Sequence, residues 1–360
     1  MKRKKILFVA SHRPGRAPGQ RFRFEQYFDF LRQNGFDCEL SYIISENDDK
    51  LLYRKGHYLE KFSIHRRSLK KRKNDVLRAG EFDIIFIFRE AIVTGSVKFE
   101  KLFRKSGAKI VFDFDDAIWH LDVSEANRMF GFLKRPQKTG EIIGLSDLVF
   151  AGNNYLAEYA RKFSTNVAIV PTTIDTEEYK AEIPAGKNGK ITIGWSGSLT
   201  TIKHFEFAVP FLRELKKKHG DKISVKVIGD GTYVNEELGV KGIPWKKEDE
   251  VKELSTFDIG IMPLPDDEWA KGKCGLKGLQ YMALGIPTIM SPVGVNTEII
   301  TEGVNGFLAT STEEWVRKIE SLITSEELRR KMGSEARRTV EEKYSVSAWK
   351  EKYLELLRSL

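Results

Sequence analysis

The stretch Lys271–Pro292 holds the residues whose types and spacing best suit chemistry. It follows the strand-like run Phe257–Leu264 and a polar loop, and it then reads as the start of a helix. Cations at a helix N-terminus oppose the helix dipole, so they cost stability unless an anion binds there. Lys273 and Lys277 are predicted to share a helix face, with Gln280 one turn deeper, where its amide suits a ribose hydroxyl. The pattern therefore predicts a diphosphate site.

The loop after the strand-like run Ile191–Trp195 is a second candidate for phosphate binding. Gly197 permits a close backbone approach, Ser198 offers a hydroxyl, and Lys203 suits a phosphate as a point charge. A plain helix N-cap with a surface lysine is the structural alternative. Farther along, Ile243–Trp245 is predicted to form one wall of a binding site for a flat base. A position of Trp245 in the hydrophobic core fits the pattern equally well.

Acidic residues gather near the end of a strand-like run in the N-terminal half. Asp113 lies within the run Lys109–Phe114, and Asp115 and Asp116 follow it. Adjacent like charges raise the pKa of at least one carboxyl group, which suits a general base acting on a substrate hydroxyl. We therefore predict Asp115 or Asp116 as a catalytic residue on the acceptor side. A metal site is the alternative, but no His or Cys cluster in the sequence supports it.

Further acceptor-side candidates stand near this acidic group. Trp119 can stack on a sugar ring, although a core tryptophan is the commoner case. Arg89 and Glu90 directly follow the strand-like run Asp83–Phe88, and Glu90 is a third candidate for a catalytic role. These residues are expected to face the same edge of a sheet as the aspartates.

The loop after the first strand-like run completes the acceptor-side set. Gly19 suits a loop close to a ligand, and Arg21 and Arg23 sit at the next predicted helix start. The structural alternative makes at least one of these arginines solvent-facing. His12 is a lone histidine, for which a structural role is more common than catalysis.

Strand-like runs alternate with amphipathic segments throughout, which predicts parallel sheets with helices on both faces. The expected strands are Lys5–Ser11, Phe36–Ile43, Asp83–Phe88, Lys109–Phe114, Asp147–Ala151, Val167–Val170, Ile191–Trp195, Ser224–Ile228, Phe257–Met262 and Pro287–Met290. We expect two doubly wound domains, residues 1–175 and 176–344, that face each other across a cleft. Helices are expected at Arg21–Gln33, Tyr155–Phe163, Ser325–Lys343 and Ser345–Leu360, with Ser345 as an N-cap.

Bulk properties narrow the class of protein. The chain of 360 residues has 41% hydrophobic residues and a mean hydropathy of −0.37, as expected of a globular protein. No apolar run reaches the roughly 18 residues needed to cross a bilayer. The five-residue apolar stretch after the basic N-terminus is short for a secretory signal. With only Cys38 and Cys274 there is no disulfide framework, so we expect a cytoplasmic setting.

The net charge of +9 lies entirely in residues 1–175. Its centre is the segment Arg54–Lys73, which carries nine Lys or Arg against one Glu. Such a run favours an anionic surface through its summed field, and a solvated helix face is an equally good explanation. Membrane lipid on the cytoplasmic face is the expected partner. Nucleic acid is the rival, but no helix-turn-helix, zinc or aromatic RNA-binding pattern appears.

The segment Gly275–Ile289, with Ser291-Pro-Val-Gly and Glu302-Gly-Val-Asn-Gly-Phe-Leu308 after it, resembles the donor-binding signature of the GT-B glycosyltransferases. It is most similar to the retaining class called family 4, or glycosyl transferases group 1. The resemblance implies two Rossmann-like domains, with the last helix crossing back to the first domain. It also implies a nucleotide-sugar donor, transfer with retained configuration to a glycan or lipid-linked glycan in polysaccharide biosynthesis, and no metal or other cofactor.

The resemblance also assigns donor residues and shows departures. Gly275 and Leu276 fall within its helix start, and Lys203 matches a lysine that contacts the diphosphate. Ser198 stands where an arginine is expected. The family has two glutamates eight positions apart, and here Gln280 and Gly272 occupy those positions.

Lys273 and Lys277 are expected to replace the missing positive charge. Asp266, Asp267 or Glu268 is expected to take over the sugar contact. Two alternatives remain open on the same scaffold: a sugar-nucleotide epimerase, and a non-catalytic protein that binds an anionic surface or nucleic acid.

Overall fold

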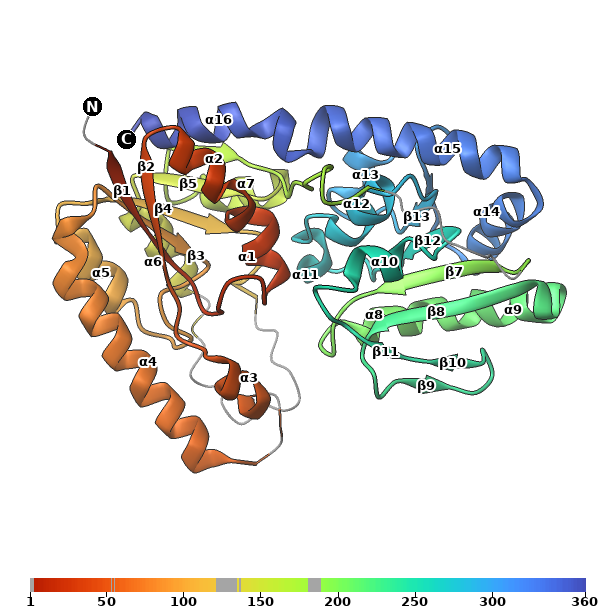
Figure 1. The fold of residues 1–360 in the computed structure, drawn as a ribbon, viewed down its shortest axis with the longest axis horizontal. Helices are drawn as coiled ribbons and strands as arrows, with labels where there is room; N and C mark the ends of the chain where they lie inside the picture. The colour runs from red at the N-terminus through yellow and green to blue at the C-terminus, as the bar shows by residue number, and fades with distance from the viewer. Residues whose placement is uncertain (1–2, 53, 55, 121–134, 136, 181–188) are drawn as a thin grey trace. The chain divides into compact units, whose positions relative to one another are not determined.

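A computed structural model describes residues 3–52, 54, 56–120, 135, 137–180 and 189–360 (Figure 1). The chain forms two compact units, Met1–Thr172 with Lys350–Leu360, and Thr173–Trp349. The predicted boundary between the two domains lies after Asp175, three residues later than the boundary in the structure. Each unit contains a parallel six-stranded sheet, which confirms the predicted α/β class.

The first unit is built on a sheet in the order β2-β1-β3-β4-β5-β6. All its neighbouring strands pair in parallel. Every residue of its third strand, with the sequence IIFIF, is buried, as expected of a strand covered on both faces. The strands are β1 Lys4–Val9, β2 Phe36–Ser41, β3 Ile84–Phe88, β4 Lys109–Phe114, β5 Leu148–Ala151 and β6 Val167–Ile169.

Helices cover this sheet in two layers. The helices are α1 Pro18–Arg23, α2 Phe28–Gln33, α3 Glu46–Leu52, α4 Tyr58–Arg78, α5 Lys98–Arg104, α6 Gln137–Leu145 and α7 Asn154–Ala160, with the end of α16 Val346–Arg358. Helix α5 packs against both α4 and α6. On α16, Tyr353 stacks on Tyr27 at a ring distance of 4.3 Å and meets Phe150 of β5 edge-on. The predicted helix Arg21–Gln33 is divided by a 3₁₀ turn, Glu25–Tyr27.

The second unit has a sheet in the order β11-β8-β7-β12-β13-β14 and a small antiparallel ribbon, β9–β10. The sheet is parallel throughout. Each strand expected from the sequence has a counterpart, but the short strands were missed because two residues carry too little periodicity. The strands are β7 Ile191–Ser196, β8 Ile223–Gly229, β9 Val234–Asn235, β10 Val240–Lys241, β11 Ile243–Pro244, β12 Ile259–Met262, β13 Thr288–Met290 and β14 Phe307–Leu308.

Serines set the helix boundaries near the end of the chain. The helices of this unit are α8 Ile202–Phe205, α9 Val209–His219, α10 Glu250–Leu254, α11 Glu268–Lys271, α12 Leu276–Ala283, α13 Asn296–Ile299, α14 Thr312–Thr324 and α15 Glu326–Thr339. The hydroxyls of Ser311 and Ser325 accept the N–H groups of Glu314 and Leu328. Ser345 caps α16 as predicted, since its hydroxyl accepts the Ala348 N–H at 3.0 Å.

The order of the strands decides where a ligand can bind. In an open parallel sheet the ligand lies beyond the carboxyl ends of the strands, where the strand order reverses. That point lies between β1 and β3 in the first unit and between β7 and β12 in the second. The loops after these four strands, together with the helices that follow them, include most of the site residues predicted above. In the part of the chain that the structure describes, no helix is both long and apolar enough to cross a membrane.

Candidate functional site

The loop after β7 and helix α12 are joined directly at the switch point of the second sheet. The phenol oxygen of Tyr281 on α12 accepts the backbone N–H of Ser196 at 2.7 Å and lies 2.8 Å from its hydroxyl. Tyr281 is fully buried, and burial raises the pKa of its hydroxyl. This buried connection holds the two predicted phosphate-binding segments together.

Three of the predicted donor lysines act on one buried histidine of α8. His204 is 3% exposed, and the charges of Lys277, Lys273 and Lys203 together with burial lower its pKa from 6.5 to about 3. Burial is the largest cause, and Asp267 alone opposes the shift among the named charges. The three lysines come from two segments of the chain, since Lys203 lies on α8, Lys277 lies on α12 and Lys273 shortly precedes α12. His204 was not predicted as a site residue, because it does not belong to a recognisable sequence motif.

The lysines are placed differently from the predicted arrangement. Helix α12 begins at Leu276, after Gly275 in the left-handed conformation (φ +69°), so Lys273 precedes the helix and does not share a face with Lys277. The ammonium groups of Lys273 and Lys277 lie 5.0 Å from the rings of Trp269 and Trp195, respectively. The glycine at the N-cap explains the late start, since it adopts a backbone conformation that ends the preceding loop.

The acidic residues before α12 have structural partners. Helix α11 is capped by the Asp267 side chain, which accepts the Ala270 N–H at 2.7 Å. Lys271 ends α11 and pairs with Glu268 at 2.6 Å, so it does not lie at the start of α12 as expected. A sugar contact by Asp266, Asp267 or Glu268 stays a prediction.

Gln280 takes part in a buried network within the second unit. It is 5% exposed, and its amide donates to the Tyr179 hydroxyl at 2.8 Å. That hydroxyl donates to Glu250 at 2.7 Å, and the same carboxylate accepts the indole N–H of Trp245 at 2.7 Å. Tyr179 and Glu250 were not predicted, because they lie about 100 and 30 positions from Gln280 in polar segments. A ribose contact by Gln280 stays a prediction.

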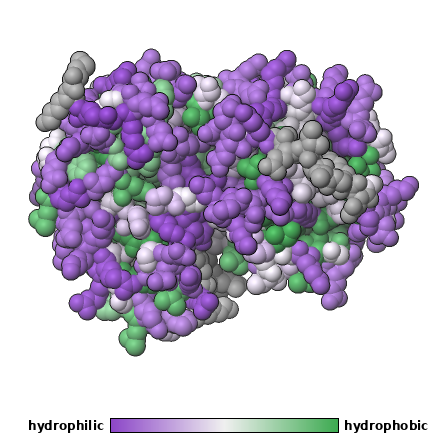
Figure 2. Space-filling model, in the orientation of Figure 1, coloured by the Kyte–Doolittle hydropathy of each residue, from purple (hydrophilic) through white to green (hydrophobic). Residues whose placement is uncertain are grey.

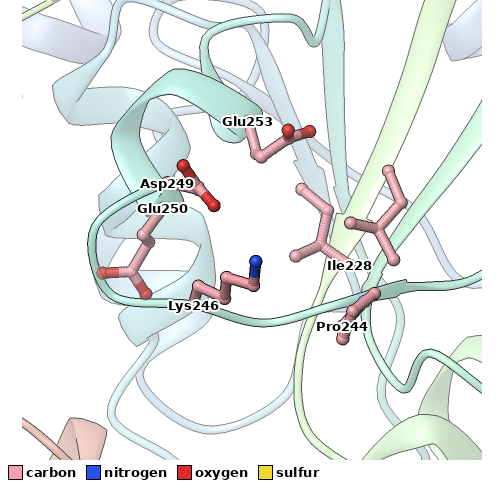
Figure 3. A pocket seen from close by; sticks show the side chains of 7 residues that line it. Ile228, Pro244, Lys246, Asp249, Glu250 and Glu253 are labelled. Atoms are coloured by element: carbon pink, nitrogen blue, oxygen red, sulfur yellow. The ribbon is translucent and has the colours of Figure 1, made fainter.

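A cavity of about 220 Å³ lies beside this network. Its wall includes Ile243 and Pro244, which belong to the segment Ile243–Trp245 that was predicted to form one wall for a flat base. Figure 3 shows aliphatic side chains entering from the strands on one side and carboxylates from α10 and its preceding turn on the other. The lining residues are Ile228, Ile243, Pro244, Lys246, Asp249, Glu250 and Glu253.

The loop after β7 combines packing with exposure. A side chain at Gly197 would put its Cβ 2.2 Å from the Trp195 ring, so the close approach expected here is made with the protein's own tryptophan. Ser198 is exposed, and its carbonyl accepts the N–H groups of Thr201 and Ile202 as a helix cap would. Lys203 is also exposed on α8.

In the first unit, Arg89 brings the two predicted acidic residues together. Its guanidinium pairs with Asp115 at 2.7 Å and with Asp116 at 2.5 Å. Arg89 adopts a left-handed backbone (φ 62°), which is unfavourable for a non-glycine residue and typical of functional sites. Gly19 lies against the same group, since a Cβ there would be 2.9 Å from an Asp115 oxygen. The structure thus assembles four predicted acceptor-side residues.

Asp113 lies deeper than this partly buried group. It is fully buried and ion-paired with Arg23, and burial more than any neighbouring charge raises its pKa from 3.8 to about 6. The expected crowding of carboxylates contributes less, through Asp115. Arg21 and Arg23 are 6% and 1% exposed, so the expectation that at least one faces solvent is wrong. The sequence could not show that a carboxylate in β4 draws Arg23 inward.

The remaining acceptor-side candidates have protein partners. Glu90 pairs with Lys138 at 2.9 Å. Trp119 stacks on Tyr159 with a ring distance of 3.8 Å and parallel planes. Their proposed catalytic and sugar-stacking roles stay predictions. Among the described residues, no group of three or more His, Cys, Asp or Glu side chains is placed to hold a metal ion.

Comparison with known proteins supplies the class of protein. Two solved structures superpose on nearly the whole chain. One is sucrose-phosphate synthase from Thermosynechococcus elongatus, with a TM-score of 0.69, 14% identity and coverage of 99% of both chains. The other is Anabaena Alr3699/HepE in complex with UDP and glucose, with a TM-score of 0.66, 15% identity and coverage of 99% and 100%. The fold is therefore GT-B, with two Rossmann-like domains.

The family follows from the sequence of the second unit. Residues 175–339 match the family model of glycosyl transferases group 1. Spore coat protein SA of Bacillus subtilis (strain 168) is 27% identical over 187 residues, which are 47% of this chain and 48% of that protein, so the match spans about half of this curated relative. The second unit is therefore similar to the group 1 glycosyltransferases, as the resemblance in its sequence implied.

Proposed function

We propose that the protein transfers a sugar from a nucleoside-diphosphate sugar to an acceptor hydroxyl with retention of anomeric configuration. The observation that carries the proposal is the position of the Lys277 ammonium group, 5.0 Å from the indole of Trp195 in β7, at the switch point of the unit that matches the group 1 family model. The departing diphosphate gains negative charge as the glycosidic bond breaks. Preorganised ammonium groups and backbone N–H groups stabilise that charge. The lysines supply the charge that a divalent cation would bring, so the proposal includes no metal requirement.

The donor is proposed to bind with its base near the cavity in Figure 3. Ile228, Ile243 and Pro244 offer apolar contact to a flat ring, and carboxylates such as Asp249 can accept its N–H groups. The structure of Alr3699/HepE in complex with UDP and glucose makes UDP-glucose the first donor to test. Gln280 and Glu250 are proposed to form hydrogen bonds with the ribose of the donor.

The acceptor is proposed to bind at the Arg89 group of the first unit. Asp115 and Asp116 are held by one guanidinium, so their oxygens are positioned to accept hydrogen bonds from an acceptor hydroxyl. Gly19 packs closely against Asp115, and Trp119 and Glu90 follow neighbouring strands. A glycan or a lipid-linked glycan fits such a set of hydroxyl-binding groups.

The test compares Lys277→Ala with Lys217→Ala, an exposed lysine on α9. Loss of a charged phosphate contact is expected to cost about 1.5–3 kcal/mol, or about 10- to 100-fold in donor affinity, while Lys217→Ala behaves as wild type. Thermal shift against UDP-, GDP- and ADP-sugars measures binding, and product analysis with and without a glycan acceptor distinguishes transfer from epimerisation. Equal affinity in Lys277→Ala and wild type would disprove the phosphate role.

A membrane surface is proposed as the docking partner, through one face of helix α4. Exposed side chains on this helix recur at three- and four-residue intervals and therefore form a single stripe. The stripe is Leu59, Phe62, Arg66, Lys70, Lys73 and Leu77. Its leucines are each 84% exposed and Phe62 is 62% exposed. Apolar residues that enter the interface and cations that meet anionic headgroups are the mark of a peripheral amphipathic helix.

The opposite face of α4 packs into the first unit, which leaves the stripe exposed to solvent. Its buried residues are Lys61, Ile64, Ser68, Arg72 and Asp75, which lie half a turn away from the stripe. Figure 2 shows mainly hydrophilic surface along α4, with a hydrophobic patch at the end of the helix in the lower part of the view. Charge complementarity thus favours anionic lipid. The expected cytoplasmic location remains a prediction.

A further inference from the structure

The loop after β1 carries two arginines, Arg13 and Arg16, that a tight turn brings together as an arginine pair. The Arg16 N–H donates to the Arg13 carbonyl at 3.3 Å, which closes the turn. Gly15 has the left-handed backbone (φ +74°) that a type II turn requires at its third position, and Pro14 suits the second. The first and fourth residues of such a turn lie within about 7 Å of each other, so the two side chains start from neighbouring points.

Asp49 of helix α3 holds both members of the arginine pair. Its Oδ2 accepts an N–H from Nη1 of Arg13 at 2.8 Å and another from Nε of Arg16. The Asp49 side chain is 7% exposed, whereas those of Arg13 and Arg16 are 29% and 34% exposed. Each guanidinium has several further N–H groups, for which the described residues supply no other hydrogen-bond partner. These donors are therefore available on the partly exposed side of the pair.

The arginine pair keeps a positive charge after its neighbours are counted. Two guanidinium groups share the single Asp49 carboxylate, and the ring of His12 lies 4.0 Å from the other oxygen of that carboxylate. Burial lowers the pKa of His12 from 6.5 to about 4, so this ring adds no charge near neutral pH. One positive charge thus remains, and the carboxylate is the more deeply buried partner. Such a cluster attracts an anion with donors that are already held in place.

The arginine pair is fixed at the same sheet edge as the proposed acceptor group. The side-chain amide of Gln20 accepts the His12 N–H and donates to the His12 carbonyl, each at 2.8 Å, so it holds the start of the loop. The residue before it, Gly19, packs against Asp115. Strands β1 and β3 are paired neighbours, and the loops that follow them carry the arginine pair and Arg89. An acceptor at Asp115 therefore lies on the side of the sheet edge where the pair is found.

We propose that the arginine pair binds a phosphate group of the acceptor. The inference rests on the proposed transfer and narrows its acceptor to a phosphorylated molecule. Two guanidinium groups present N–H donors from two directions, which suits the tetrahedral oxygens of a phosphate, whereas one guanidinium is enough for a planar carboxylate. The bound phosphate anchors the acceptor, and a hydroxyl elsewhere on the acceptor hydrogen-bonds to Asp115 or Asp116.

The first experiment measures binding by calorimetry with excess UDP present to occupy the donor site. The probes are glucose 6-phosphate, as a free sugar phosphate, and glucose joined through a diphosphate to a short prenyl chain, as a lipid-linked source. Wild type is expected to bind at least one of them, and the tighter one identifies the source. The double variant Arg13→Gln with Arg16→Gln should bind that probe about 10- to 100-fold more weakly. Arg67→Gln is the matched control, since Arg67 pairs with Asp48 on the same helix α3, and it should behave as wild type.

A second experiment uses only the wild-type protein and does not depend on a variant folding. Phenylglyoxal labels accessible guanidinium groups, and peptide mass spectrometry locates the labels. A phosphorylated probe is expected to protect Arg13 and Arg16 but not Arg67, and unphosphorylated glucose should protect none of them.

Three outcomes would overturn the inference. Equal affinity of wild type and the double variant for the phosphorylated probes, or labelling that these probes do not change, would remove the phosphate site and leave the donor site intact. Tighter binding of glucuronate than of both phosphorylated probes would replace the phosphate by a carboxylate. Failure of every sugar nucleotide to bind would end the proposed transfer, and with it the acceptor role of the pair, even where phosphate still protects the two arginines.

Discussion

At the residue scale, Arg89 shows how the fold accepts local strain at a candidate site. Its left-handed backbone is unfavourable by roughly 1–2 kcal/mol for an L-residue. In return its guanidinium is aimed at Asp115 and Asp116, two carboxylates that would repel each other if they were placed side by side without a cation. Substitutions at Arg89 can separate the free-energy cost of its backbone conformation from the contribution of its ion pairs.

Arg89→Ala and Arg89→Gly form a matched pair for this purpose. Both variants remove the guanidinium, but only glycine adopts the left-handed conformation without cost. We expect Arg89→Ala to be less stable than Arg89→Gly by about 1 kcal/mol in urea unfolding. Both should lose transfer activity to a similar extent. Wild-type turnover in Arg89→Gly would show that the guanidinium is not needed.

At the element scale, helix α4 has two faces with different roles. One is buried against the first unit, and its fully buried Arg72 pairs with Asp75 at 2.9 Å. The other carries the stripe from Leu59 to Leu77. The high positive charge of the segment is therefore not spread evenly around the helix, and the part of it that is exposed is available to an anionic surface.

Replacing Arg66, Lys70 and Lys73 by glutamine tests the stripe. Each cation near an anionic bilayer contributes about 1 kcal/mol, so the triple variant should bind phosphatidylserine vesicles about 100-fold more weakly. Sedimentation with vesicles measures this.

The apolar part of the stripe has its own control. Leu59→Ser with Phe62→Ser should weaken binding further, whereas Phe207→Ser, an exposed phenylalanine of the second unit, should not. Unchanged vesicle binding in the triple variant, or tighter binding of wild type to nucleic acid than to vesicles, would argue against a membrane role.

At the scale of the whole molecule, the first unit depends on both ends of the chain. Its sheet is formed by residues before Thr172, but Lys350–Leu360 belongs to the same unit. Tyr353, Leu354 and Leu357 are each at most 1% exposed. The last helix thus supplies core residues to a unit that begins some 350 positions earlier.

Tyr353→Ala is expected to destabilise the first unit by about 3–5 kcal/mol, because it removes a buried aromatic ring and its stack on Tyr27. Hydrogen exchange measured peptide by peptide should speed up in β1–β6 and stay unchanged in β7–β14. Glu351→Ala, on the exposed side of the same helix, is the control. Equal protection of both sheets in Tyr353→Ala would contradict this assignment.

Local patterns in the sequence determined the strands, the two parallel sheets and the importance of the lysine-rich loop. These features depend on runs of apolar residues and on turn residues that are adjacent in the chain, so periodicity detects them. The motif from Gly275 to Ile289 likewise indicated the family whose model matches residues 175–339. Even the cap at Ser345 followed from local pattern.

Only the tertiary structure decided the partners of the site residues. The pairing of Arg89 with Asp115 and the burial of Arg23 against Asp113 both join segments far apart in sequence. Which strands are neighbours sets these distances, and the order of strands in a sheet is not written in any single segment. The charges were visible in the sequence, but the burial that sets their pKa values arises only when the sheets and helices pack.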